Sequence, residues 1–281
     1  MKKFLSIILT VALIAALAAC GGTEDNAGGG AEGGNEESTE LVVGASNVPH
    51  AEILEQAKPI LAEQGIDLTI ETFQDYVVPN QALESGELDA NYFQHIPYLE
   101  SQMAEHGYEF EVAGAIHIEP IGVYSKKYKS LDELPDGATI IMSSSVPDHG
   151  RILSMLEAEG LITLKEGIEK TKATIEDIVE NEKNLDFQTE YEAALLPQIY
   201  NNDEGDAVLI NSNYAIDAGL NPLEDAIALE EQESPYANVI AVNKGDKDNE
   251  AIQALVEVLH SAEIQEYILE QYEGAVVPVT E

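Results

Sequence analysis

The sequence predicts an α/β fold in which mostly parallel strands are covered by helices. Short apolar runs of strand length alternate along the chain with longer segments whose apolar residues recur every three or four positions. Alternation of this kind is typical of βαβ units and of a mostly parallel sheet. No repeat with a period of roughly 20–50 residues is present, so a solenoid is not expected. Residues 41–281 are long enough for one large or two medium α/β domains.

The first half of the folded region shows three strand–helix pairs. The helix expected at 50–64 has its apolar residues at helical spacing and stops before Gly65, which suits the end of a helix. The segment 67–73 alternates apolar and polar residues, as a half-buried strand does. The expected strands are 41–45, 67–73 and 88–92, and the expected helices are 50–64, 79–85 and 97–105.

A second series of elements begins near Ser130. Pro147 stands near the first turn of its expected helix, where proline is tolerated. The expected strands are 138–142, 207–210 and 239–242, and the expected helical segments are 147–159, 211–218 and a pair within 249–272. Open α/β sheets bind ligands beyond the carboxyl ends of their strands, so the residues that follow each strand are the first candidates for a site.

The N-terminus predicts export and a lipid anchor. Lys2 and Lys3 precede an apolar stretch at 4–16, and Leu-Ala-Ala-Cys closes it at Cys20, the order of a secretory signal peptide over residues 1–19. Cys20 is the only cysteine, which excludes a disulfide within the chain, and its setting resembles the lipidation motif of bacterial lipoproteins. A chance cysteine at an ordinary cleavage site is the alternative. Residues 20–40 are acidic and glycine-rich, so we expect a disordered tether on the extracytoplasmic side of the cell membrane.

The charge and the motifs exclude several classes of function. A formal net charge of −40 disfavours nucleic acid as a partner, since nucleic acid requires a basic surface. No Walker loop, dinucleotide-binding fingerprint, Gly-x-Ser-x-Gly or His-Glu-x-x-His motif is present. The six histidines do not recur at metal-ligand spacing, and Ser143–Ser145 with Asp148 and His149 lie too close in sequence to favour a catalytic triad. We therefore expect no catalytic residue, no metal and no cofactor.

One arginine stands out among the basic residues. The chain has a single arginine, Arg151, and its other basic residues are all lysines. A guanidinium can hold a carboxylate through two parallel hydrogen bonds, which an ammonium cannot do. Gly150 beside it would allow a close backbone approach. A surface arginine left by composition bias is the alternative reading.

Aromatic and amide side chains follow several of the expected strands. Rings at strand ends can form walls around a small apolar group, and amides can orient an amino acid's polar end. Any one of these residues is more typical of a core, but together they favour a binding site. The aromatic candidates are Tyr76, Phe93, His95 and Tyr98, and the amide candidates are Asn211 and Asn238.

The same residues lie within motifs that resemble one family, the methionine-binding lipoproteins of the NlpA type, which are substrate-binding proteins of ABC transporters. The resemblance covers residues 41–281, and its strength lies in the set of motifs. The motifs are Phe73-Gln-Asp-Tyr-Val-Val-Pro-Asn80, Asp89-Ala-Asn-Tyr-Phe-Gln-His-x-Pro-Tyr98, Tyr124-Ser-Lys-Lys127, Gly150-Arg151, Asn211-x-x-Tyr214 and Glu233-Ser-Pro-Tyr-x-Asn238.

The resemblance implies a two-lobed type II periplasmic-binding-protein fold with the ligand in the cleft between the lobes. Lobe 1 would comprise residues 41–123 and 238–281, and lobe 2 residues 124–237. It implies a small amino acid as ligand, methionine foremost, and an ABC permease with its ATPase subunit as partners. The four aromatic candidates would line the side-chain pocket, Arg151 would hold the carboxylate, and Asn211 and Asn238 would orient the amino-acid backbone.

One position departs from the family pattern. The family has Asn-Asp-Pro-x-Asn-x-Gly-Arg before the helix, and this chain has Asp148 at the second asparagine. An acid there could pair with Arg151 or bind the ammonium group of a ligand. Another apolar amino acid or a methionine-containing dipeptide therefore stays open as the ligand. A surface interaction protein is the remaining alternative.

Overall fold

The computed structural model describes residues 38–279 except 232–234. These residues belong to one compact unit, Glu37–Glu281. The predicted signal peptide, Cys20 and all but the last three residues of the tether lie outside the described residues. None of the helices within the described residues combines the length and the apolar character needed to cross a bilayer.

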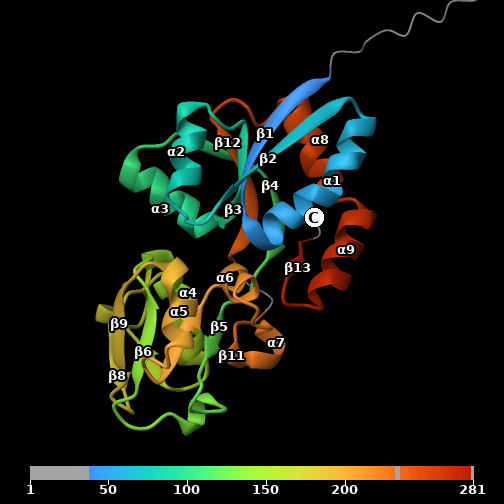
Figure 1. Ribbon diagram of the computed structural model, residues 1–281. Coiled ribbons are helices and arrows are strands. Elements are labelled where there is room, and N and C mark those ends of the chain that lie inside the picture. Colours follow the sequence, from blue (N-terminus) through green and yellow to red (C-terminus); the bar gives the residue numbers. More distant parts are fainter. Residues whose placement is uncertain (1–37, 232–234, 280–281) are drawn as a thin grey trace, which may run out of the picture. The chain divides into compact units, whose positions relative to one another are not determined.

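The first sheet has six strands in the order β13-β4-β12-β3-β1-β2 (Figure 1). Strand β1 pairs in parallel with β2 and β3, while β12 runs antiparallel to both β3 and β4. The strands are β1 (Thr39–Ser46), β2 (Ile66–Phe73), β3 (Ala90–His95), β4 (Phe110–Ile118), β12 (Ala237–Asn243) and β13 (Val277–Pro278).

Helices cover both faces of this sheet, as the alternating pattern of the sequence requires. On one face Ile53 and Leu61 of α1 pack with Leu255 of α8 and Ile268 of α9 in the larger core. On the other face lie α2 and α3, which share a smaller core with β12. The helices are α1 (Glu52–Glu63), α2 (Val78–Ser85), α3 (Ile96–His106), α8 (Glu250–Leu259) and α9 (Ala262–Tyr272), with a short irregular helix η1 (Asn47–Ala51) before α1.

The second sheet has five strands in the order β11-β5-β10-β6-β9. Helix α4 (Val146–Ala158) packs its apolar residues on one face, and α5 (Leu196–Asn201) packs on the other together with α6 (Ser212–Asp217). The strands are β5 (Gly122–Tyr124), β6 (Thr139–Ser143), β9 (Asp186–Tyr191), β10 (Ala207–Ile210) and β11 (Ala226–Leu229). The remaining elements are α7 (Pro222–Asp225), a hairpin of β7 (Ile162–Leu164) with β8 (Ile178–Asn181), and four 3-10 turns at Leu131–Glu133, Lys170–Lys172, Ile175–Asp177 and Ala193–Leu195.

The chain passes twice between the two sheets. It leaves the first sheet after Ile118 and joins the second at Gly122, then leaves the second after Leu229 and returns at Ala237. Strand β5 thus begins two residues before residue 124, the expected start of lobe 2. The first crossing and the ends of β3, β10 and β12 bring polar residues of both sheets together.

The predicted α/β class is confirmed, with differences in detail. Most strands of each sheet run in one direction, but β12 and β13 in the first sheet and β5 in the second run against their neighbours. Strand β3 extends to His95, three residues beyond its expected end, and every residue in it is buried. No element was expected from the sequence at β4, β5, β7, β8, β9, β11 or β13.

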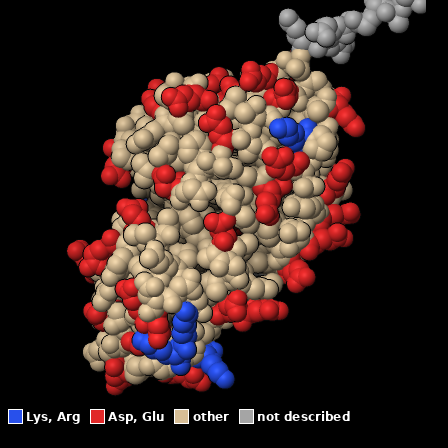
Figure 2. All heavy atoms as spheres, viewed as in Figure 1, with Lys and Arg blue, Asp and Glu red and all other residues tan. Residues whose placement is uncertain are grey.

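The acidic excess lies on the surface. Figure 2 shows aspartate and glutamate side chains distributed over the visible face, with the few basic side chains in small groups. Because the acidic side chains are spread out, the negative charge indicates a solvated surface and not a single docking patch.

Candidate functional site

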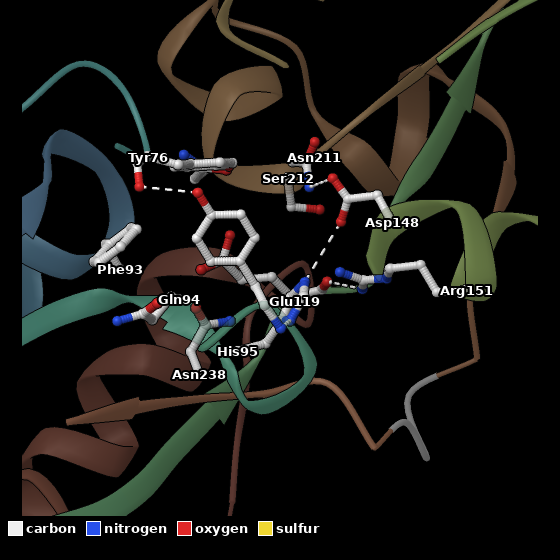
Figure 3. A pocket seen from close by; sticks show the side chains of 12 residues that line it. Tyr76, Phe93, Gln94, His95, Glu119, Asp148, Arg151, Asn211, Ser212 and Asn238 are labelled. Carbon is white, nitrogen blue, oxygen red and sulfur yellow. Dashed lines mark hydrogen bonds and ion pairs between the residues drawn. The ribbon is translucent and has the colours of Figure 1, made fainter. Parts of the chain in front are cut away.

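A cavity lies where polar residues of the two sheets meet (Figure 3). The centres of water-sized molecules can occupy about 30 Å³ of it, and all the space between its lining atoms, with the solvent at its mouth, is about 400 Å³. All seven residues proposed from the sequence as ligand-binding line it. The lining comprises Tyr76, Phe93, Gln94, His95, Tyr98, Glu119, Asp148, Arg151, Asn211, Ser212, Asn213 and Asn238.

Three rings form the apolar wall of the cavity. The ring centroid of Tyr76 lies 6.0 Å from that of Phe93 and 5.9 Å from that of Tyr98, and the last two are 6.2 Å apart. The Tyr98 hydroxyl donates to the backbone oxygen of Tyr76 at 3.0 Å, and the Tyr76 hydroxyl donates to Asn213 at 2.6 Å. These bonds fix the tyrosines and direct their apolar faces to the space between them.

His95 has a fixed tautomer because of its place in the fold. It is the last residue of β3 and caps α3, where its Nδ1 accepts a hydrogen bond from the backbone N–H of Tyr98 at 3.1 Å. A neutral His95 must then carry its proton on Nε2, which lies 3.4 Å from Oδ1 of Asp148. Phe93 and His95 were expected after the strand, but both lie within it.

Arg151 is buried in the wall of the cavity, only 4% exposed, and its bonds differ from the expected ones. Its Nε donates to Oε2 of Glu230 at 3.1 Å, and its Nη2 donates to the same oxygen and to the backbone oxygen of Glu119 at 2.7 Å. The guanidinium carbon also lies 4.7 Å from the ring centroid of Tyr236. Glu230 and the backbone oxygen of Glu119 thus occupy the Nε and Nη2 donors of the guanidinium. Only Nη1, which has no hydrogen-bond partner among the described residues, is left to donate to a ligand carboxylate.

Asp148 does not pair with Arg151. Its Oδ2 accepts from the Ser143 hydroxyl at 3.0 Å and from the Asn211 amide at 3.2 Å. Burial acts to raise the pKa of this carboxyl, but the hydrogen bond and charge of His95, the charge of Arg151 and the bond from Asn211 outweigh it and hold the pKa below its usual value. An ionised carboxylate therefore lines the cavity.

The two asparagines expected in the site are placed differently. Asn211 precedes α6 and is 8% exposed, and its Oδ1 is buried without a hydrogen-bond partner among the described residues. Asn238 lies in β12, and its Oδ1 is 3.2 Å from Nε2 of His50. His50 thereby fixes the orientation of the Asn238 amide, with its oxygen toward His50 and its NH₂ group pointing away from His50.

Behind Asn238 lies a buried cluster that residue spacing did not reveal. Oε1 of Glu119 is 2.8 Å from Nε2 of His117 and 3.1 Å from Nε2 of His50, and the other ring nitrogen of His117 bonds to the Tyr92 hydroxyl. Burial lowers the pKa of His50 to about 4 and of His117 to about 3, and burial also raises the pKa of Glu119. Potential ligand atoms of these three residues lie within 4.8 Å of one another. The facing atoms of the three residues already contact one another, and His50 supports Asn238, while Nδ1 of His50 is buried without a hydrogen-bond partner among the described residues.

Gly150 has a structural role. A Cβ there would lie 2.5 Å from the backbone oxygen of Lys170 and 2.7 Å from that of Thr171. The close approach expected beside Arg151 is therefore an approach of α4 to the 3-10 turn at Lys170–Lys172. The serine-rich segment before α4 does not assemble a triad either, because Nε2 of His149 bonds to the backbone oxygen of Ser143 and not to its hydroxyl.

Four lining residues and the partner of the arginine were not expected from the sequence. Glu119 had a detectable signal, since it follows the apolar alternation of β4 and stands before Pro120 at the first crossing between the sheets. Glu230 had none, because it opens an acidic run in a chain rich in acids. The other missed lining residues are Gln94, Ser212 and Asn213.

The sequence profile of the NlpA lipoproteins matches residues 41–280. The chain belongs to the NlpA lipoprotein family. The methionine-binding lipoprotein MetQ of Bacillus subtilis (strain 168) is 50% identical over 283 residues, with 100% of each chain covered.

Two solved structures of substrate-binding proteins are similar to this NlpA chain. A nutrient binding protein from Burkholderia cenocepacia, solved bound to methionine, is 43% identical with a TM-score of 0.81, covering 85% of this chain and 100% of that one. An ABC transporter periplasmic substrate-binding protein from Coxiella burnetii is 39% identical with a TM-score of 0.80, at the same coverage of both chains. The fold is therefore that of the family's substrate-binding proteins.

Proposed function

We propose that the protein is the extracytoplasmic substrate-binding lipoprotein of an ABC importer and that its cavity binds a small amino acid, methionine foremost. The observation that carries this proposal is the pairing, in one cavity, of an aromatic wall with an arginine and a carboxylate. Such a site matches a zwitterion that bears one apolar side chain. The methionine-bound relative and the methionine-binding lipoproteins of the family support the choice of ligand.

In this proposal the wall of Tyr76, Phe93 and Tyr98, with the edge of His95, encloses the ligand's side chain. Burying a thioether side chain contributes ~1.5–3 kcal/mol, and contacts between sulfur and the ring edges add about 0.3–1.5 kcal/mol. The contacts thus favour methionine over aliphatic side chains of similar size by a modest margin only.

The polar end of the ligand lies toward α4 and α6. Nη1 of Arg151 donates to the carboxylate, since the other edge of the guanidinium is held by Glu230. Asn211 and Asn238 orient the amino-acid backbone, the latter through an amide that His50 fixes. A hydrogen bond with a charged partner contributes about 1.5–3 kcal/mol, so these contacts weigh as much as the side-chain contacts.

The remaining parts of the proposal concern the location of the protein and its partners. Cys20 carries lipid after removal of residues 1–19 and anchors the chain to the outer side of the cell membrane. The protein delivers its ligand to a permease whose ATPase is a separate subunit, and it performs no catalysis. The family's description as lipoproteins and the transporter relative support this reading.

Calorimetric titration tests the ligand assignment. Purified protein is titrated with methionine, with other apolar amino acids and with methionine-containing dipeptides, and we expect the strongest binding, with one site per chain, for methionine. Phe93→Leu should weaken that binding, whereas the same change at Phe187 of β9, away from the cavity lining, should leave it unchanged. Absence of heat for every sulfur-containing ligand would refute the assignment.

A further inference from the structure

Among the described residues, the cavity is lined by more carboxylates than permanent cations. The cavity is lined by two buried carboxylates, Asp148 and Glu119, and by one permanent cation, Arg151. That cation is already paired with a third carboxylate, Glu230. A buried ionised carboxylate requires a positive partner or several hydrogen bonds. Glu119 has two histidines as partners, so the group to explain is Asp148.

Asp148 has unused capacity to accept hydrogen bonds. It is 2% exposed, and its Oδ2 accepts two bonds, from Ser143 and Asn211. Its Oδ1 has only the long contact of 3.4 Å with Nε2 of His95. A carboxylate offers about four acceptor positions on its two oxygens. The described residues thus leave part of this carboxylate for another donor.

A second unused acceptor lies beside it. Oδ1 of Asn211 is buried and has no hydrogen-bond partner among the described residues, although the NH₂ group of the same amide donates to Asp148. A buried acceptor without a partner costs free energy unless a ligand or water supplies a donor. Figure 3 shows Asn211 and Asp148 next to each other above the cavity. An ammonium, which has three donors and no acceptor, fits such a pair.

We propose that Asp148 and Asn211 form an ammonium site and that the α-ammonium, not the α-carboxylate, is the main polar anchor of the ligand. This inference rests on the proposed function and names the ligand class more closely: compounds with a free primary ammonium beside a methionine-like side chain. Loss of the carboxylate is tolerated better than loss of the ammonium, because Glu230 already occupies most of Arg151. The family pattern has asparagine at this position, so the charge of Asp148 is what makes this chain favour the ammonium over the carboxylate.

Two analogues of methionine test the inference on the unmodified protein. One lacks only the amino group and the other lacks only the carboxyl group, so neither adds bulk. Calorimetry should show a loss of affinity of about 100-fold for the analogue without the amino group and about 10-fold for the one without the carboxyl group, relative to methionine.

Asp148→Asn restores the family's amide and removes the charge. Methionine and the analogue without the carboxyl group should bind this variant about 10- to 100-fold more weakly, while the analogue without the amino group should bind as before or more tightly. Asp246→Asn, at an exposed position outside the cavity, removes the same charge and should change none of the three affinities.

The outcomes separate the two proposals. If methionine binds and the two analogues lose affinity equally, or if the carboxylate proves the stronger anchor, the ammonium site is refuted and the proposed function stands. The same holds if Asp148→Asn weakens all three ligands alike. Failure of methionine and both analogues to bind the unmodified protein would refute the proposed function and this inference together.

Discussion

The buried pair of Arg151 and Glu230 should be strongly coupled in stability. Their side chains are 3% and 11% exposed, and Glu230 is also held by the backbone N–H of Ile121 at 3.1 Å. Removing one partner of a buried pair leaves an uncompensated charge and typically costs ~3–5 kcal/mol. We therefore expect Arg151→Met to lower the free energy of unfolding by about 3 kcal/mol and Glu230→Gln, which keeps an acceptor for Ile121, by about 2 kcal/mol.

The double variant should be less destabilised than the sum of the single changes. Since neither charge is then left alone, the coupling energy in a double-mutant cycle should be about 2 kcal/mol. Urea unfolding of the four proteins measures it. The half-exposed pair of Lys127 and Asp206, 3.5 Å apart, serves as a control whose coupling should stay below about 1 kcal/mol. Single effects at Arg151 and Glu230 that add within about 0.5 kcal/mol would refute the pairing.

Three further results are expected. As pH falls from about 6.5 to 4, the free energy of unfolding should decrease by about 1.4 kcal/mol per pH unit for each of His50 and His117. The reason is that the unfolded chain takes up protons that the buried rings, with pKa values of about 4 and 3, do not. Urea unfolding of His117→Gln should show a shallower dependence on pH, and an unchanged slope would contradict this. Gly150→Ala should lower the free energy of unfolding by about 1–3 kcal/mol, since its Cβ would meet the backbone oxygen of Lys170 at 2.5 Å. Thermal unfolding measures this, and an unchanged melting temperature would contradict it. Phe93→Ala should weaken methionine binding about 10-fold or more by calorimetry, and equal affinity would remove that ring from the site.

The raised pKa of Glu119 acts against the histidines in that pH range. Burial favours its protonated form in the folded chain, so its contribution to stability is largest at low pH and is lost as pH rises through the carboxyl range. Asp148 has the opposite sign, since its lowered pKa adds stability that is lost as pH falls below its usual pKa. Because His117 also contacts Glu119, the change in slope in His117→Gln reports on these two residues together.

Local sequence patterns were sufficient for most of the fold. The helices and strands with clear periodicity, such as α1 and β2, are within a few residues of their expected bounds. The elements without a prediction are mainly short or partly exposed; β7 and β8, for example, carry too few apolar residues for a period to show. Strand direction could not be read locally either. Strand β12 has the pattern of any buried strand, and its antiparallel course follows from the return crossing after β11.

The sequence indicated many of the residues that line the candidate site but not their hydrogen-bond partners. The single arginine, the rings near strand ends and the family motifs indicated seven residues, and the structure brings all of them to one cavity. Which atoms remain for a ligand depends on neighbours distant in sequence. Glu230 is 79 residues from the arginine it holds, and His50 is 188 residues from the Asn238 amide it orients. Only the folded chain brings these pairs together.

A crystal structure of the protein grown with methionine tests the central claim most directly. We expect the thioether among the rings of Tyr76, Phe93 and Tyr98, the carboxylate within about 3 Å of Nη1 of Arg151, and the ammonium within about 3 Å of Asp148. An empty cavity, or a ligand bound elsewhere with these rings collapsed on one another, would contradict the account.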